Sequence, residues 1–129
     1  MKFLIVLTML IVGGIFALHT TMQNGQFLKY IDTHPDPKVV PPLLSFIGEA
    51  YYITHDLQNS ATYYQRIDDQ YPQSSYADDA YYNYLVALDD AETPRLKMAD
   101  LYGTYLEKYP KGKNTEIVHK KIEYCRNAR

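Results

Sequence analysis

The sequence YYQRIDDQYP at residues 63–72 recurs in altered form as LYGTYLEKYP at residues 101–110, and a shorter version, FLKYIDTHP, occupies residues 27–35. All three end on a proline, and these prolines are 37 and 38 residues apart. Aligning the two longer copies on their prolines, without gaps, pairs Ala61 with Ala99, Tyr64 with Tyr102, Ile67 with Tyr105, and Tyr71 with Tyr109. Spacings of three and four residues place side chains on one face of an α-helix, and proline ends a helix because it lacks the backbone donor. Each copy is therefore predicted to be the last part of a helix.

A second helix in each repeat is predicted from the residues that follow the prolines. Thirteen residues after each proline the chain carries Gly48, Leu85 and Glu123, and each is preceded by an apolar or aromatic residue. No segment alternates polar and apolar residues with a period of two, so no sheet is expected. The predicted fold class is all-α, with helices near residues 3–33, 39–54, 59–71, 76–89, 94–109 and 115–127.

Two of these helix starts carry residues that are typical of N-caps. Thr93 precedes Pro94, and this pair predicts a threonine cap with proline in the first helical position. Asn59 or Ser60 is predicted to cap the helix that begins near residue 59, because both side chains can accept a hydrogen bond from the first turn.

The N-terminal segment FLIVLTMLIVGGIFAL, residues 3–18, contains no charged side chain. Sixteen helical residues span about 24 Å, and an extension to Met22 gives about 30 Å, the thickness of a bilayer core. We therefore expect residues 3–22 to enter a membrane, as the core of a transmembrane signal-anchor helix over residues 1–25. A membrane-proximal helix end and linker is expected at residues 26–38.

A cleaved signal peptide is the alternative to this anchor. The position three residues before a cut after Ala17 is Ile15, where a small residue is usual. No cysteine follows the apolar run to carry a lipid, so a lipoprotein is not expected. For a retained anchor, Lys2 and the terminal amine favour the cytoplasmic side and place the rest of the chain across the membrane.

Residues 44–72 resemble a tetratricopeptide repeat, a helix pair with the signature W-x2-L-G-x2-Y followed by A-x3-F and P. Leu44 occupies the tryptophan position, and Ser60 and Tyr64 occupy the alanine and phenylalanine positions. The remaining matches are Ile47, Gly48, Tyr51, Ile67 and Pro72. The second unit, about residues 75–110, departs from the pattern because Leu85 stands in the glycine position.

Phrases such as YPQSSYADDAYYNYL and YLEKYP are similar to a bacterial envelope type of this family, typified by the Tol-Pal coordinator protein and the lipoprotein of the outer-membrane β-barrel assembly machinery. The resemblance implies a short solenoid of helical hairpins over residues 39–129, with about two helix pairs and a C-terminal capping helix. In such an envelope the anchor would lie in the inner membrane, with the N-terminus cytoplasmic and the C-terminal domain periplasmic.

The repeat pattern separates packing residues from residues that would face a partner. Small residues let the helices of a pair approach closely, and aromatic residues fill the space between pairs. The 14 tyrosines suit a thin array, because a tyrosine buries its ring while its hydroxyl stays in water or in a hydrogen bond. The expected packing residues are Leu44, Ile47, Gly48, Tyr51, Ala61, Tyr64, Ile67, Pro72, Ala99, Tyr102 and Pro110. The resemblance implies a concave, partner-binding groove along the first helix of each pair, at Ser45, Glu49, Tyr52, Tyr82, Val86 and Asp89.

Charge is distributed unevenly along the chain. The formal net charge of −2 gives no reason to expect nucleic acid, whose phosphates call for a basic surface. Residues 56–92, however, carry one basic and eight acidic side chains, and residues 93–129 carry nine basic and four acidic ones. The acidic middle segment is expected to steer a basic partner, or alternatively to meet the basic end of another copy.

No arrangement that is typical of catalysis or metal binding occurs in the sequence. The aspartate pairs at residues 68–69, 78–79 and 89–90 point about 100° apart on a helix and lack the spacing of a calcium loop, so they are expected to be solvated or capping charges. The histidines have no partner four residues away, and Cys125 is expected to be a small buried hydrophobe. We therefore expect a protein that is not an enzyme, with no metal, cofactor or small-molecule substrate.

The leading functional hypothesis is a non-catalytic, membrane-anchored protein–protein interaction module. Its partners would be other proteins of a bacterial membrane complex, in which the chain is an accessory or scaffolding subunit. The alternative is a free periplasmic adaptor or assembly factor after signal-peptide cleavage, which could also self-associate. Because such arrays usually need roughly three repeats, we expect the exposed ends to be covered, either by the anchor helix packing against residues 39–54 or by a partner.

Overall fold

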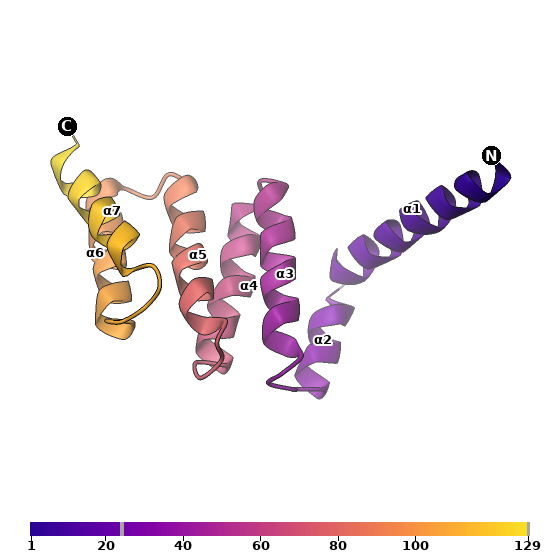
Figure 1. The fold of residues 1–129 in the computed structure, drawn as a ribbon, viewed down its shortest axis with the longest axis horizontal. Coiled ribbons are helices and arrows are strands. Elements are labelled where there is room, and N and C mark those ends of the chain that lie inside the picture. The colour runs from indigo at the N-terminus through magenta and orange to yellow at the C-terminus, as the bar shows by residue number, and fades with distance from the viewer. Residues whose placement is uncertain (24, 129) are drawn as a thin grey trace. The chain divides into compact units, whose positions relative to one another are not determined.

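A computed structural model describes residues 1–23 and 25–128 of the chain, and these residues form seven α-helices and no strand (Figure 1). The helices are α1 (Lys2–Gln23), α2 (Gln26–Thr33), α3 (Val40–Ile53), α4 (Leu57–Gln70), α5 (Ala77–Asp90), α6 (Arg95–Lys108) and α7 (Thr115–Asn127). The predicted all-α fold class is therefore confirmed. The chain divides into two compact units, Met1–Asp36 and the residues from Pro37 onward.

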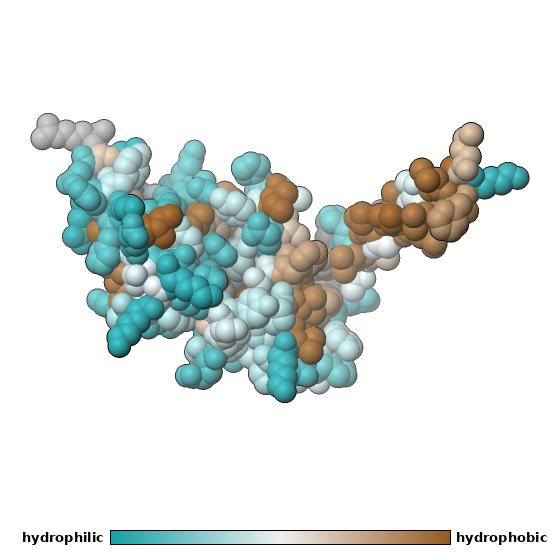
Figure 2. Space-filling view, in the orientation of Figure 1, coloured by the Kyte–Doolittle hydropathy of each residue, from teal (hydrophilic) through white to brown (hydrophobic). Residues whose placement is uncertain are grey.

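The first unit begins with α1, whose side chains are exposed from residue 2 to residue 20 and form a hydrophobic surface (Figure 2). The hydroxyls of Thr8, Thr20 and Thr21 donate to carbonyl oxygens four residues earlier, at 2.8, 2.9 and 2.7 Å. These donors are satisfied inside the helix, which is what a hydrocarbon environment requires. The segment Lys2–Met22 is long and apolar enough to cross a membrane, a property that it shares with signal sequences.

The predicted continuous helix over residues 3–33 is wrong, because the chain turns at Gly25. This glycine has a φ of +67°, in the left-handed region that residues other than glycine rarely adopt. Its N–H donates to the carbonyl oxygen of Met22 at 3.3 Å, and α2 begins at the next residue. Helices commonly end at a glycine just after their last turn. The prediction missed this end because the apolar run before Gly25 favours one continuous helix.

In the second unit, α3 to α7 run up and down, with each helix beside the next in the chain (Figure 1). The helix α3 packs against α4 and also contacts α5, while α6 packs against α7. All five helices begin and end within two residues of their predicted positions.

The predicted N-caps of α4 and α6 are wrong in detail. The carboxylate of Asp56 caps α4, accepting from the backbone N–H of Asn59 at 3.2 Å, so the helix begins earlier than the Asn59 or Ser60 cap implied. Pro94 itself is the N-cap residue of α6, with a ψ of 134° that leaves it outside the helix, and no side chain caps that end. Thr93 therefore precedes the cap, because the extended backbone of Pro94 delays the first helical residue to Arg95.

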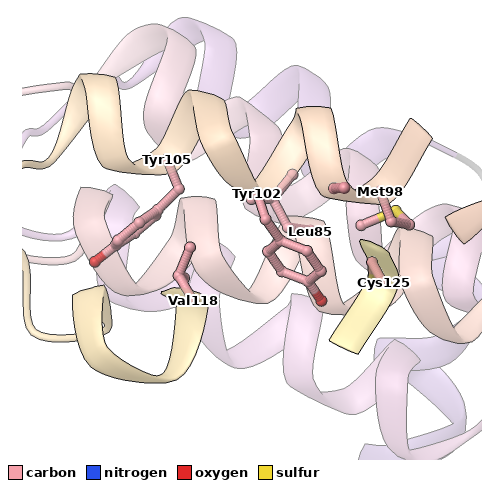
Figure 3. Packing of buried hydrophobic residues seen from close by; sticks show 7 residues of the cluster. Leu85, Met98, Tyr102, Tyr105, Val118 and Cys125 are labelled. Atoms are coloured by element: carbon pink, nitrogen blue, oxygen red, sulfur yellow. The ribbon is translucent and has the colours of Figure 1, made fainter. Parts of the chain in front are cut away.

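A cluster of buried side chains lies between α5, α6 and α7, where two tyrosines of α6 extend toward the neighbouring helices (Figure 3). Its members include Leu85, Met98, Tyr102, Tyr105, Val118 and Cys125. Most predicted packing residues are buried, namely Leu44, Ile47, Gly48, Ala61, Tyr64, Ile67, Ala99 and Tyr102. Tyr51 is half-buried, whereas Pro72 and Pro110 are exposed and directly follow the C-cap residues of α4 and α6. The two prolines end helices and do not fill the core.

Gly48 marks the close approach of α3 and α4. A Cβ atom at this position would lie 3.0 Å from the Cε1 and Cζ atoms of Tyr64. The Ser60 hydroxyl of α4 also donates to the Gly48 carbonyl oxygen at 2.8 Å, inside the helix pair. A side chain at residue 48 would therefore require the Tyr64 ring to shift, and a large one would overpack the contact between the two helices.

We predict that Gly48→Leu lowers the free energy of unfolding by about 1 to 3 kcal/mol, because the added atoms overpack the contact with Tyr64. Thermal unfolding followed by circular dichroism measures the change. Gly103→Leu is the matched control, since nothing lies within 4 Å of a Cβ at that helical position. Equal melting temperatures for Gly48→Leu and the parent chain would contradict the close packing of α3 on α4.

Candidate functional site

Four of the six predicted groove residues come together on α3 and α5. The Tyr52 hydroxyl of α3 donates to the Asp90 carboxylate of α5. Glu49, one turn before Tyr52, accepts from the Tyr64 hydroxyl of α4 at 2.9 Å. We call the surface formed by Glu49, Tyr52, Tyr82, Asp89 and Asp90 the tyrosine–carboxylate face.

The α6–α7 hairpin adds further groups to this face. The Asp89 carboxylate accepts from the Tyr102 hydroxyl of α6 at 2.8 Å and from the Lys121 ammonium of α7 at 3.4 Å. The Lys121 Nζ atom lies 5.4 Å from the centre of the Tyr102 ring, over its face. The face therefore carries three carboxylates, those of Glu49, Asp89 and Asp90, against the one ammonium group of Lys121, which leaves it acidic.

The tyrosines of the face lie close enough to its charged groups for their pKa values to be affected. The hydrogen bond to Asp90 raises the pKa of Tyr52, and burial and the charges of Asp90 and Glu49 add to that effect. Burial raises the pKa of Tyr82, while Lys121 opposes this change and Asp89 and Asp90 reinforce it. Both hydroxyls stay protonated at neutral pH and act as hydrogen-bond donors or acceptors.

Ser45 and Val86, the other two predicted groove residues, lie on the same two helices and are half-buried. Sequence reasoning missed Asp90 and Lys121. Asp90 could have been predicted, because it directly follows the candidate residue Asp89 in the sequence. Lys121 had no such signal, because its place depends on how α7 folds back after α6.

The aspartate pairs were predicted to be solvated or capping charges. This prediction is wrong for Asp68, which is only 3% exposed. Its carboxylate accepts from the Tyr109 hydroxyl at 2.6 Å and forms an ion pair with Lys108. A buried carboxylate needs such partners, since an unpaired one would cost several kcal/mol. The pattern of charges alone could not show this burial, because both partners lie about 40 residues further along the chain.

The acidic middle and the basic end of the chain neutralise each other in part within one molecule. Lys108, Lys113 and Lys121 pair with Asp68, Asp79 and Asp89, respectively, the last two at 3.2 and 3.4 Å. The Tyr105 hydroxyl and the backbone N–H of Lys113 also bind Asp78. The acidic middle and the basic end were expected to meet in different copies of the chain. Several of these charges instead pair with each other within one copy.

The face offers hydrogen bonds and negative charge, and no arrangement of a reactive group with a base is seen in it. No group of three or more potential metal-ligating side chains is found among the described residues. Burial raises the pKa of the Cys125 thiol, and a neutral buried thiol is a poor nucleophile. No protein-family model matches the chain, and no curated protein matches it significantly.

We predict that Asp68→Ala and Asp69→Ala differ sharply, although the two residues are adjacent. Removing the buried Asp68 carboxylate leaves the half-buried Tyr109 hydroxyl without its acceptor and should lower the free energy of unfolding by about 1 to 3 kcal/mol. Asp69 is exposed, so Asp69→Ala should change that free energy by less than about 0.5 kcal/mol. Denaturant titration of both variants tests this, and equal effects would contradict the burial of Asp68.

The chain should also unfold when the tyrosines that donate to carboxylates between helices ionise. Burial, aided by hydrogen bonds to carboxylates, raises the pKa of Tyr64, Tyr102 and Tyr109 far above 10 and that of Tyr105 to about 12. Because these pKa values are higher in the folded than in the unfolded chain, folding is favoured while the tyrosines are protonated. The resulting stabilisation is complete below the unfolded pKa of about 10 and is lost as pH rises from there through the folded-state pKa values. We expect a cooperative loss of helical circular dichroism above pH 10, coincident with tyrosinate absorbance. Complete ionisation near pH 10 with the helices intact would contradict this account.

Proposed function

We propose that the chain is a non-catalytic, membrane-anchored protein–protein interaction module, acting as an accessory or scaffolding subunit of a bacterial membrane complex. The helix α1 would be retained as a single-pass anchor in the inner membrane, with the N-terminus in the cytoplasm. The helices α3 to α7 would form a short tetratricopeptide-like array in the periplasm. The observation that carries the proposal is the tyrosine–carboxylate face, built by α3 and α5 at the positions implied for partner binding.

The features of α1 support the anchor. Its apolar side chains are exposed, and its threonine hydroxyls are bonded within the helix. Lys2 at its start favours retention of the N-terminus on the cytoplasmic side.

Three features of the second unit support an interaction module with repeat-like packing. The close contact of Gly48 with Tyr64 matches the small-residue position of the repeat, and α3 contacts α5 as the first helices of successive pairs would. The face combines aromatic rings with an excess of carboxylates, which favours a partner segment that presents lysine or arginine. Solenoids of this kind generally bind and seldom react.

Mass spectrometry of a C-terminally tagged full chain, expressed at native level and purified in mild detergent, tests the proposal. We expect stoichiometric membrane-complex partners together with an intact N-terminus that retains residues 1–18. A chain recovered alone, or one that begins near Leu18, would contradict the anchored subunit and favour the free periplasmic adaptor.

The same purification tests the tyrosine–carboxylate face. Glu49→Gln combined with Asp90→Asn removes two negative charges but keeps an oxygen acceptor for each tyrosine hydroxyl, so the fold should remain. We expect the partner to be recovered at least tenfold less, whereas the control Asp69→Asn with Asp100→Asn removes two exposed charges on other helices and should bind normally. Equal partner recovery by both double variants would contradict binding at this face.

A further inference from the structure

The ammonium group of Lys121 lies in a site that the fold builds from one carboxylate and one tyrosine. The Asp89 carboxylate of α5 is 3.4 Å from the Lys121 Nζ atom, and the same carboxylate accepts from the Tyr102 hydroxyl at 2.8 Å. The Nζ atom also lies 5.4 Å from the centre of the Tyr102 ring, over its face. Opposite charge and the electrons of the ring face both favour an ammonium group there. We call these three residues the Lys121 site.

The sequence repeat places the same positions one unit earlier in the chain. Each position is counted from the prolines that end the repeated phrases, at Pro35, Pro72 and Pro110. The corresponding pairs are Tyr102 with Tyr64, Lys121 with Asn83, and Asp89 with Tyr52. The tyrosine of the Lys121 site therefore has a counterpart in the first unit, whereas the lysine is replaced by an asparagine.

The packing of the helices agrees with this register. Lys121 and Asn83 each stand between two buried residues of their own helix, one three residues before and one four residues after. The buried residues are Val118 and Cys125 on α7, and Ala80 and Ala87 on α5. Because equal spacing gives an equal direction on a helix, a long side chain at residue 83 is expected to point toward α3 and α4 as Lys121 points toward α5 and α6.

The first unit has carboxylates and tyrosines at this place. The Tyr64 hydroxyl donates to Glu49 at 2.9 Å, and the Tyr52 hydroxyl donates to Asp90. The hydrogen bond to Asp90 raises the pKa of Tyr52, and burial and the charges of Asp90 and Glu49 add to this, so both carboxylates act on one hydroxyl. We call Glu49, Tyr52, Tyr64 and Asp90 the Glu49–Asp90 site.

The two sites differ in charge. In the Lys121 site the aspartate is paired with a lysine of the same chain. Glu49 and Asp90 are both exposed, and neither belongs to an ion pair found among the described residues. The Glu49–Asp90 site therefore presents two negative charges to a partner where the next unit satisfies its carboxylate internally.

We propose that the Glu49–Asp90 site binds a lysine side chain of the partner protein, with its ammonium group at the place that Lys121 takes in the next unit. This inference rests on the proposed function and names the chemical group that the tyrosine–carboxylate face recognises. The two carboxylates and two tyrosine oxygens supply acceptors for the three N–H donors of an ammonium group.

The geometry favours lysine over arginine. Arginine is recognised best by a carboxylate that offers both oxygens to its planar fork of donors. Glu49 and Asp90 lie on different helices, and each already accepts from a tyrosine hydroxyl. Single oxygens from two directions suit a compact ammonium group.

Asn83→Lys tests the site without any partner, because it supplies the ammonium group from within the chain. Asn83→Met is the matched control, with a similar length, a similar helix propensity and no charge. We expect the full chain to melt about 2 °C or more higher with Asn83→Lys than with Asn83→Met. In the background of Glu49→Gln with Asp90→Asn, the two variants should melt together. Equal melting temperatures in the parent background would overturn the proposed ammonium site.

Partner recovery from mild detergent tests whether the partner uses the same site. Asn83→Lys should reduce recovery at least tenfold, because its own ammonium group then occupies the site, and Asn83→Met should leave recovery unchanged. Equal losses with both variants would overturn the proposal, since a steric block and not the charge would then explain them.

Cross-linking with a carbodiimide, which condenses a carboxylate with a lysine amine, identifies the group that the partner supplies. We expect peptide mass spectrometry to find Glu49 or Asp90 joined to a lysine of the co-purified partner, with linkage of Asp89 to Lys121 as the internal positive control. A partner that is recovered without a link to either carboxylate would overturn the proposal. Absence of any partner from the parent chain would instead contradict the proposed function, and the melting comparison would still decide whether the site binds an ammonium group.

Discussion

The hydrogen bond from a tyrosine hydroxyl to a carboxylate on another helix is the interaction on which the array depends. A thin row of helices has few fully enclosed positions, so large rings must fill the space between helices while their hydroxyls still need partners. Carboxylates supply these partners between α3 and α4, where Glu49 accepts from Tyr64, and between α5 and α6, where Asp89 accepts from Tyr102 and Asp78 from Tyr105; Asp68 of α4 accepts from Tyr109. Each bond joins two helices, and the Tyr109 bond connects the end of α6 to α4.

These bonds also determine where charge is available for binding. Several acidic residues of the middle segment and three lysines of the C-terminal segment are used inside the fold. The net charge of either segment is therefore larger than the charge that its surface presents to a partner. Carboxylates gather on the surface that α3 and α5 share, where Lys121 is the opposing cation. The proposed function uses this local excess and not the difference between the two halves of the chain.

The sequence predicted the features that depend on local periodicity. Helices α3 to α7 and the contact at Gly48 follow from the repeated phrases, because three-and-four spacing and helix-ending prolines act over a few residues. The six candidate groove residues came from the resemblance to the repeat family, and four of them meet on α3 and α5. The burial of Asp68 and the position of Lys121 were not predictable, since each depends on residues that come close only after the helices pack. The helix break at Gly25 had a local signal, but the long apolar run before it favoured one continuous helix.

A double-mutant cycle between Tyr102 and Asp89 tests this account most directly. Tyr102→Phe, Asp89→Ala and the double variant would be compared by denaturant unfolding in the full chain, with the effect on Lys121 cancelling in the cycle. If the hydroxyl–carboxylate bond joins α6 to α5 as described, the two changes are coupled by about 1 kcal/mol or more. Free energies that add to within about 0.3 kcal/mol would contradict the claim that these bonds hold the array together.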